Sequence, residues 1–185
     1  GTMIQGDSIE YHLLDKWSKN FDCKGYYSCE IGVREGLGSK IIMDNVKNNY
    51  MHIGIDPYGS LKYQHYDEGG DYVCDYTDEM RDRLLKDFAG YKSRFHLANM
   101  KDTEFMDTNA DKRFMFVHLD GPHMTRDVMI ESIWFGARAA SGCRFVFDDY
   151  PKYNMQLISD ALKPLGFKVL EQGKNKICLE KTPSI

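Results

Sequence analysis

The stretch Cys29-Glu30-Ile31-Gly32-Val33-Arg34-Glu35-Gly36-Leu37-Gly38 decides the fold class. An apolar run ends at Gly32, and the glycines that follow open a segment in which Leu37 and Ile41 have helical spacing. A buried strand that turns directly into a helix is the first half of a βαβ crossover. We therefore expect an α/β protein whose functional side chains follow the ends of its strands.

The remainder of the chain alternates strand-like and helix-like segments in the same way. Strands are predicted at 26–31, 51–55, 94–97, 114–119 and 143–147, and a closing hairpin at 168–170 and 176–180. Helices are predicted from a start at Asp7-Ser8-Ile9-Glu10 with Leu13 and Trp17, from Met80, Leu84 and Phe88, from Ile130, Ile133, Trp134 and Ala137, and from Ile158, Ala161, Leu162 and Leu165. This pattern indicates a mainly parallel sheet covered on both faces, with one antiparallel strand at the end.

Length and composition favour one domain over residues 1–185, in which Gly1 and Thr2 before Met3 are interpreted as a cloning remnant. The formal charge of -4 argues against nucleic acid as a partner, because phosphate binding needs clustered basic residues. No apolar run of about 20 residues or signal pattern is present, so we expect no membrane partner and a cytoplasmic location. Five scattered cysteines are typical of buried thiols in a reducing compartment.

The loop after Gly32 favours a nucleoside cofactor that carries positive charge. A dinucleotide fingerprint would need glycine where Arg34 and Leu37 stand. Glu30 and Glu35 would repel a diphosphate, but they suit the ammonium and sulfonium groups of S-adenosylmethionine. Asp56 follows the next strand, where an acid commonly accepts hydrogen bonds from ribose hydroxyls. Alternatively, Gly32 is only a tight strand-to-helix corner.

Four motifs together resemble class I S-adenosylmethionine-dependent methyltransferases: residues 30–36, Gly54-Ile55-Asp56-Pro57, Leu119-Asp120-Gly121-Pro122-His123 and Phe147-Asp148-Asp149. The sequence is most similar to the metal-dependent O-methyltransferase branch that includes the macrocin O-methyltransferase type and, more remotely, catechol O-methyltransferases. The resemblance implies a Rossmann-like three-layer sandwich with strand order 3-2-1-4-5-7-6 and strand seven antiparallel. The cofactor-binding residues expected from the loop and from the resemblance are Glu30, Gly32, Glu35, Gly36, Asp56, Asn99, Met100 and Asp120.

In that fold, strands four and five are neighbours, so Asp120, Asp148 and Asp149 are expected side by side. Clustered carboxylates need a cation, and oxygen ligands select Mg²⁺ first, or else Mn²⁺ or Ca²⁺. His123 lies at the position that carries the catalytic base in catechol-type relatives, and we expect it to deprotonate the acceptor with Asp120 beside it. The plainer readings are helix caps for the aspartates and a loop residue for His123. His12, His52, His65, His96 and His118 are expected to be ordinary packing or surface residues.

Residues 58–77 hold five tyrosines and Gly69-Gly70, and are expected to form an irregular lid or acceptor-binding loop. A surface loop packed on the helix of Leu84 is the alternative. Pro122 stands where several sugar-methylating relatives carry an acid, so their base cannot be transferred to this position. We expect O-methylation of a hydroxyl on a small molecule or saccharide, by a possible homo-oligomer. The alternatives are a metal-independent methyltransferase, an NAD-dependent oxidoreductase and a non-catalytic cofactor-binding domain.

Overall fold

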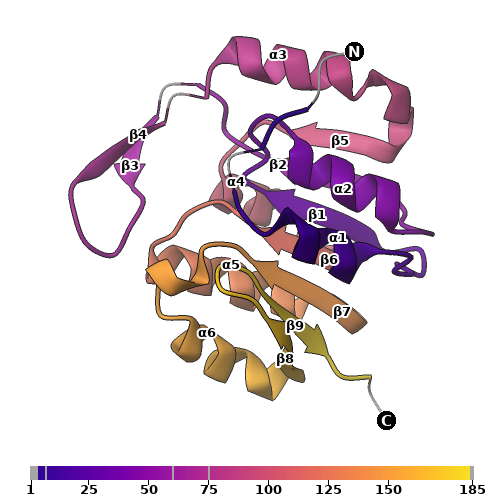
Figure 1. Ribbon diagram of the computed structural model, residues 1–185, viewed down its shortest axis with the longest axis vertical. Helices are drawn as coiled ribbons and strands as arrows, with labels where there is room; N and C mark the ends of the chain where they lie inside the picture. The colour runs from indigo at the N-terminus through magenta and orange to yellow at the C-terminus, as the bar shows by residue number, and fades with distance from the viewer. Residues whose placement is uncertain (1–3, 7, 60, 75, 184–185) are drawn as a thin grey trace.

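The computed structural model describes residues 4–6, 8–59, 61–74 and 76–183. A seven-stranded sheet with the order β5-β2-β1-β6-β7-β9-β8 forms its centre (Figure 1). Five neighbouring strands are parallel, namely β5, β2, β1, β6 and β7, and β9 runs antiparallel to both of its neighbours. The predicted order 3-2-1-4-5-7-6 is therefore confirmed, since it counts only the strands of this sheet. The strands are β1 Tyr27–Ile31, β2 His52–Ile55, β5 Phe95–Ala98, β6 Phe114–Leu119, β7 Ala139–Phe147, β8 Phe167–Gln172 and β9 Ile177–Lys181.

Helices cover both faces of this sheet, as right-handed βαβ crossovers require. Helices α1 and α2 pack together on one face, and α5 and α6 pack together on the other (Figure 1). The α-helices are α1 Tyr11–Ser18, α2 Leu37–Asn45, α3 Asp78–Asp87, α4 Asp102–Thr108, α5 Thr125–Ala137 and α6 Met155–Leu162. Short 3-10 helices span Ala89–Arg94, Tyr150–Lys152 and Lys163–Leu165.

The main core lies on the two faces of the central strands. All six residues of β6 are buried, and aromatic side chains of β6, β7 and α5 interlock there, including Phe114 against Phe135 with ring centroids 4.9 Å apart. Burying one such side chain stabilises the fold by about 1.5–3 kcal/mol. This continuous burial keeps the carboxyl ends of β1, β6 and β7 in fixed positions. The polar residues that directly follow these strands are therefore also held in place.

Two local predictions are wrong. The segment expected to be irregular forms a β-hairpin, with β3 Leu61–Gln64 and β4 Asp71–Cys74, although residues 60 and 75 lie outside the described part. Helix α5 buries Val128, Ser132 and Phe135, whereas Ile130 and Ile133 are 46% and 41% exposed. The helix predicted from Ile130, Ile133, Trp134 and Ala137 is thus confirmed, although its buried face is a different one, and Ile130 lines a cavity next to the sheet.

The first helix also begins later than predicted, at Tyr11. Glu10 has a left-handed backbone (φ 62°) and makes no side-chain cap to its own helix, because its carboxylate binds residues 174–176 instead. Asp7, part of the predicted start, lies outside the described residues.

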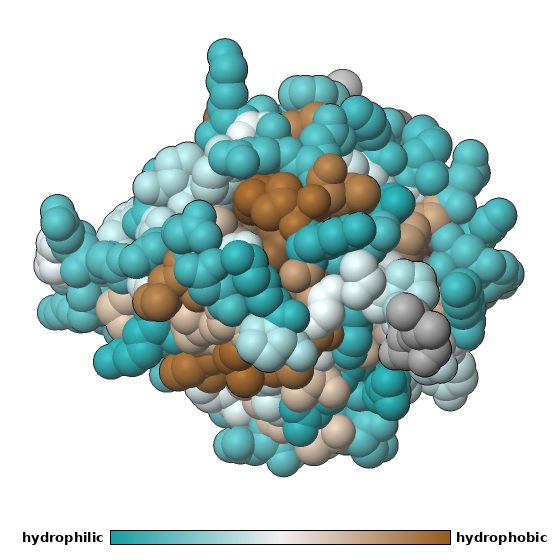
Figure 2. Space-filling model, turned by 90° about the horizontal axis from the view of Figure 1, so that it is seen from below, coloured by the Kyte–Doolittle hydropathy of each residue, from teal (hydrophilic) through white to brown (hydrophobic). Residues whose placement is uncertain are grey.

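Figure 2 shows the molecule from the side of α6 and β8, where apolar atoms form several patches separated by hydrophilic side chains. Exposed apolar residues of these two elements are Leu157, Val169 and Leu170. Such scattered residues are normal on soluble domains and do not define an interface. In the part of the chain that the structure describes, no helix has the length and apolar character needed to cross a membrane.

Candidate active site

Two adjoining cavities, of about 290 and about 200 Å³, open at the carboxyl ends of β1, β2 and β6. Gly32, Arg34, Tyr76 and Asp120 line both of them. This is the edge at which parallel α/β sheets bind ligands. The polar residues that the sequence places after strands are thus gathered around one hollow region.

Gly32 is required by close packing between the loops that follow β1 and β6. Its φ is +83°, and a Cβ built on it would lie 2.1 Å from the Asp120 carbonyl oxygen. The amide of Asp120 donates to the Ile31 carbonyl at 2.9 Å, which ties the two loops together. Gly32 is therefore a tight corner, as the plainer reading held, and it is also the residue that lets Asp120 approach the cavity.

The buried carboxylate of Glu30 covers the first turn of α2. A Cβ on Gly38 would lie 1.9 Å from Glu30 Oε2, so the acid occupies the helix N-terminus where a phosphate would otherwise bind. Glu30 is 1% exposed and lines the smaller cavity. Its charge is unsuited to a diphosphate and suits a ligand with an ammonium or sulfonium group, so these residues fit S-adenosylmethionine.

Asp56 lies at the end of β2 and lines the larger cavity. Its Oδ2 accepts a hydrogen bond of 2.9 Å from the Arg34 amide. Burial raises its pKa to about 6, because the charged form loses more solvation than this hydrogen bond and the nearby guanidinium return. A buried acceptor at this position can take hydrogen bonds from ligand hydroxyls, and the ribose role of Asp56 stays a prediction.

The other predicted cofactor residues divide between the cavity and its surroundings. Glu35 lines the smaller cavity. Gly36 faces α3, where an added Cβ would meet the Leu84 side chain, and Met100 packs against the main core. Asn99 is exposed, and the cavity wall beside it is formed by residues 101–103. The structure does not bring Gly36, Asn99 and Met100 to the cavity wall, and their cofactor contacts remain predictions.

Three acids and a histidine converge where β6 and β7 end. These strands pair in parallel with Leu119 opposite Phe147, which sets Asp120 beside Asp148. One ligand atom each from Asp120, Asp148, Asp149 and His123 lies within 4.8 Å of the others. The predicted grouping of these residues is therefore present, with Asp120 and Asp148 buried and Asp149 half-buried.

The acids of this cluster do not share their charge evenly. Burial and the neighbouring Asp148 raise the pKa of Asp120 well above its usual range. Burial also opposes ionisation of Asp148, but its hydrogen bond with Asp120 and the Lys176 ammonium outweigh this and lower its pKa. Burial followed by repulsion from Asp148 raises the pKa of Asp149. The surroundings thus favour a proton on Asp120 and a negative charge on Asp148.

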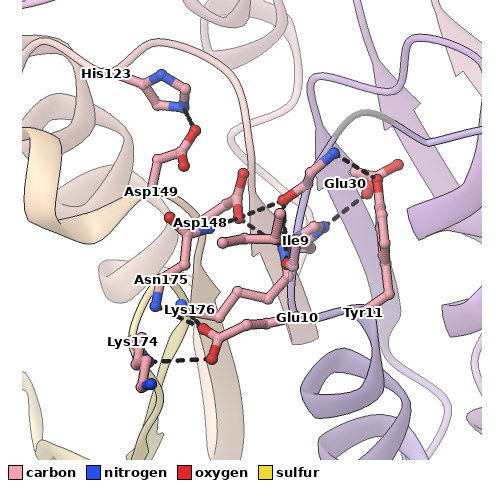
Figure 3. A network of polar contacts seen from close by, with 12 residues as sticks. Ile9, Glu10, Tyr11, Glu30, His123, Asp148, Asp149, Lys174, Asn175 and Lys176 are labelled. Atoms are coloured by element: carbon pink, nitrogen blue, oxygen red, sulfur yellow. Dashed lines mark hydrogen bonds and ion pairs between the residues drawn. The ribbon is translucent and has the colours of Figure 1, made fainter.

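Lys176, which no sequence pattern indicated, is the buried cation of the cluster, whereas Lys152, 3.8 Å from Asp149 Oδ2, is 49% exposed. Lys176 is fully buried, and its Nζ donates to Asp148 Oδ1 at 2.7 Å. The same oxygen also accepts from Ser8 Oγ at 2.6 Å and Asn175 Nδ2 at 2.9 Å, so three donors saturate it. Figure 3 labels Asn175, Lys176 and Asp148 of this group. Any further ligand of Asp148 must therefore use Oδ2. No local signal identifies Lys176, since it stands in a polar hairpin turn and its partners are distant in sequence.

The β3–β4 hairpin is attached to the loop that carries His123. The His123 amide donates to the His65 carbonyl at 2.9 Å, and the two imidazoles lie 4.4 Å apart. Asp67 accepts from both the amide and the hydroxyl of Thr125, at 2.6 and 2.5 Å. His123 Nε2 lies 3.3 Å from Asp149 Oδ2. The histidine is thereby clamped between the hairpin and the acid cluster.

A family model described as "Methyltransferase domain" matches residues 29–150, about two thirds of the chain. The chain belongs to this methyltransferase family. The expectation of an S-adenosylmethionine-dependent methyltransferase domain is thereby confirmed at the level of the family and replaces the oxidoreductase alternative. The macrocin-like branch is not singled out by this match. No curated protein matches the sequence significantly.

Solved structures of similar fold support the architecture of this methyltransferase. A protein from Corynebacterium glutamicum has a TM-score of 0.66 at 17% identity, over 97% of this chain and 84% of that chain. A Clostridium thermocellum protein proposed to be an rRNA methylase has a TM-score of 0.65 at 13% identity, over 98% and 100% of the two chains. The O-methyltransferase TomG from Streptomyces achromogenes, solved with S-adenosylmethionine, has a TM-score of 0.63 at 11% identity, over 98% and 82%.

Proposed function

We propose that this methyltransferase moves the methyl group of S-adenosylmethionine to a hydroxyl of a small molecule or saccharide, assisted by a divalent cation, as in the macrocin O-methyltransferase-like branch. One observation supports the proposed cation: Asp120 Oδ1 is buried and has no hydrogen-bond partner among the described residues. An orphaned acid oxygen is costly unless something else binds it. It lies in the cluster whose other members are oxygen or imidazole ligands.

The charges of the cluster fit one divalent cation. When an ion binds, Asp120 would give up its proton, and the three ionised acids would then exceed the buried Lys176 ammonium by two negative charges. Lys152, which is 49% exposed and 3.8 Å from Asp149 Oδ2, offsets part of this excess. Asp120, Asp149 and Oδ2 of Asp148 would hold the ion, and Mg²⁺ is the first choice among oxygen-seeking cations. When bound, the ion would lower the pKa of the acceptor hydroxyl and orient its oxygen.

The chain's own residues supply the remaining chemistry. His123 is the proposed base that takes the hydroxyl proton, and Asp149 Oδ2 beside its Nε2 would hold the ring in place. Glu30 and Asp120 would face the positive methionine end of the donor. Asp56 would accept from the ribose, and the hairpin side chain Tyr63, which lines the larger cavity, would contact the acceptor.

The metal-independent alternative has one observation in its favour. Lys176 already neutralises Asp148, and Asp120 can remain protonated, so the cluster can exist without an ion. In that case the acceptor hydroxyl would be bound directly by Asp120 and His123. Asp149 discriminates the two mechanisms, because it is a ligand in the first and only a partner of His123 in the second.

The first test is binding of Mn²⁺, followed by electron paramagnetic resonance, with S-adenosylhomocysteine binding measured in parallel by calorimetry. We expect one saturable Mn²⁺ site that Asp149→Asn weakens by at least about tenfold and that the exposed control Asp107→Asn leaves unchanged. Absence of a saturable site in a protein that binds S-adenosylhomocysteine would favour the metal-independent mechanism. Absence of both would refute the proposed function.

The second test is methyl transfer from labelled S-adenosylmethionine to pools of saccharides and phenols, with Mg²⁺ or with a chelator. We expect product in the presence of Mg²⁺ and its loss with the chelator. Product that is insensitive to the chelator would refute the metal role. If the protein binds donor but labels no hydroxyl compound in the pools, the proposed acceptor class is wrong and a non-catalytic cofactor-binding domain is favoured.

A further inference from the structure

A chain of buried polar side chains runs between the acid cluster and the cofactor cavity. Lys176 Nζ lies 2.7 Å from Asp148 Oδ1 and 3.3 Å from His118 Nε2. His118 Nδ1 lies 2.7 Å from Oε2 of Glu30, the acid over the first turn of α2. Lys176 and His118 are fully buried, and neither lines either of the two cavities described above. Figure 3 shows Lys176 and Asp148 on one side of this region and Glu30 on the other.

The direction of each hydrogen bond follows from Lys176. An ammonium has three N–H donors and no acceptor, and three acceptors surround this one: Ser8 Oγ at 3.1 Å, Asp148 Oδ1 and His118 Nε2. His118 Nε2 must therefore accept, so the ring proton is on Nδ1 and is donated to Glu30 Oε2. Lys176 thus sets the tautomer of His118, and His118 in turn binds one oxygen of Glu30.

A second row of buried polar side chains reaches Glu30 from the amino-terminal ends of β1 and β2. Ser39 Oγ donates to Glu30 Oε1 at 2.8 Å and lies 2.9 Å from His52 Nε2, whose other nitrogen lies 2.8 Å from Ser28 Oγ. Burial lowers the pKa of His52 to about 3, so this imidazole is neutral. Both oxygens of Glu30 are thus acceptors, one for each chain. The acid at the cofactor cavity is therefore held in one orientation.

We propose that Lys176 is a positioning residue for methyl-donor binding, acting through His118 on Glu30. The ammonium that balances the acid cluster also orients the carboxylate that faces the donor, so the two halves of the active site share one buried network. The cluster of Glu30, His118 and Asp120 is accordingly not a second metal site, because Glu30 and Lys176 already engage both nitrogens of His118. This inference rests on the proposed donor and is independent of the metal.

The test is the affinity for S-adenosylhomocysteine of the wild type, Lys176→Met and His118→Leu, measured by calorimetry. This ligand lacks the sulfonium, so loss of the Lys176 charge has little direct effect on it. We expect each variant to bind roughly tenfold more weakly. Because the two residues act in series, the double variant should be no weaker than either single variant. The matched control is Lys174→Met, which removes an exposed lysine two residues away and should bind as the wild type does.

Nitrogen-15 NMR of the imidazoles gives a readout that general destabilisation would not produce. In the wild type, His118 should be the neutral Nδ1–H tautomer, and in Lys176→Met its Nε2 resonance should shift as the donated hydrogen bond is lost. A wild-type Nε2–H tautomer would overturn the proposal, even if Lys176→Met fails to fold. Folded variants with unchanged affinity would also overturn it. A wild type that does not bind S-adenosylhomocysteine at all would instead refute the proposed donor.

Discussion

Replacement of Gly32 by alanine should damage the site more than the same replacement at Gly25. Both glycines have nearly the same positive φ, +83° and +84°, so both variants suffer the left-handed strain of about 1–2 kcal/mol. Gly25 has open space around it, since no heavy atom lies within 4 Å of an added Cβ. The pair therefore separates backbone strain from steric overlap.

The overlap at Gly32 can be estimated from the structure. Its Cβ would lie 2.1 Å from the backbone oxygen of Asp120, whereas ordinary contacts begin near 3.4 Å, so the two loops must separate by about 1.3 Å. Forced overlap in a packed interior costs a further 1–3 kcal/mol or so. We expect Gly32→Ala to lower the free energy of unfolding by about 2–5 kcal/mol, and Gly25→Ala by about 1–2 kcal/mol.

Urea denaturation gives the stabilities, and calorimetry with S-adenosylhomocysteine gives the effect on the site. A displacement of about 1 Å at a reacting group can cost about a hundredfold in rate, so Gly32→Ala should also lose donor affinity and turnover. Gly25→Ala should keep both. Equal destabilisation of the two variants, or unchanged ligand binding in Gly32→Ala, would refute the argument that this glycine sets the approach of Asp120.

Three further predictions concern single contacts. In the folded protein, burial raises the pKa of Asp56 from its ordinary value of 3.8 to about 6. Folding therefore favours the protonated acid, and the stability that this gives at low pH is lost as the pH rises through about 6. Asp56→Asn should therefore be more stable than the wild type by about 1–2 kcal/mol at pH 8 and equal to it near pH 3.5 in urea titrations, while binding S-adenosylhomocysteine more weakly. Asp67→Ala should free the β3–β4 hairpin from Thr125, with faster hydrogen exchange over residues 61–74; unchanged exchange would show that the aromatic contacts suffice. Glu10→Ala removes the acceptor of three amides at 174–176, and their exchange should accelerate without loss of the sheet's protection.

The order of the sheet and the place of the site could be predicted because they depend on local patterns. Alternating strands and helices with right-handed crossovers leave few topologies, and the carboxyl ends of parallel strands must share an edge. Asp120 and Asp148 meet for this reason alone. The β3–β4 hairpin was not predicted, although the sequence contains a signal for it. Leu61 and Tyr63 alternate with the exposed Lys62 and Gln64 before a glycine turn.

The buried network could not be predicted, because its stability depends on partners far apart in the chain. A lysine in a polar hairpin turn is ordinarily exposed. No residue near Lys176 in the sequence indicates that it contacts Asp148, 28 residues away, or His118, 58 residues away. His118 occupies a strand position that favours an apolar residue, so packing was the plainer interpretation. Only the parallel pairing of β1 with β6, which sets Glu30 opposite His118, brings the imidazole to its acid.

The same pairing explains why the network of Glu30, His118 and Lys176 lies inside the sheet and not among the loops at its carboxyl edge. Glu30 and His118 are the penultimate residues of adjacent strands, so their side chains lie one residue below the loops that form the site. Two polar side chains buried at this depth are tolerated only if every donor and acceptor is paired. Lys176 supplies the donor that His118 needs and the charge that Asp148 needs. Removing it would leave the Nε2 of His118 without a donor and leave Asp148 with two neutral donors but without its buried cation. Replacing His118 with leucine would remove one hydrogen-bond partner each from Lys176 and Glu30. The polar residues below the site are therefore coupled by burial itself, because Glu30 and Asp148 depend on the same two partners, His118 and Lys176.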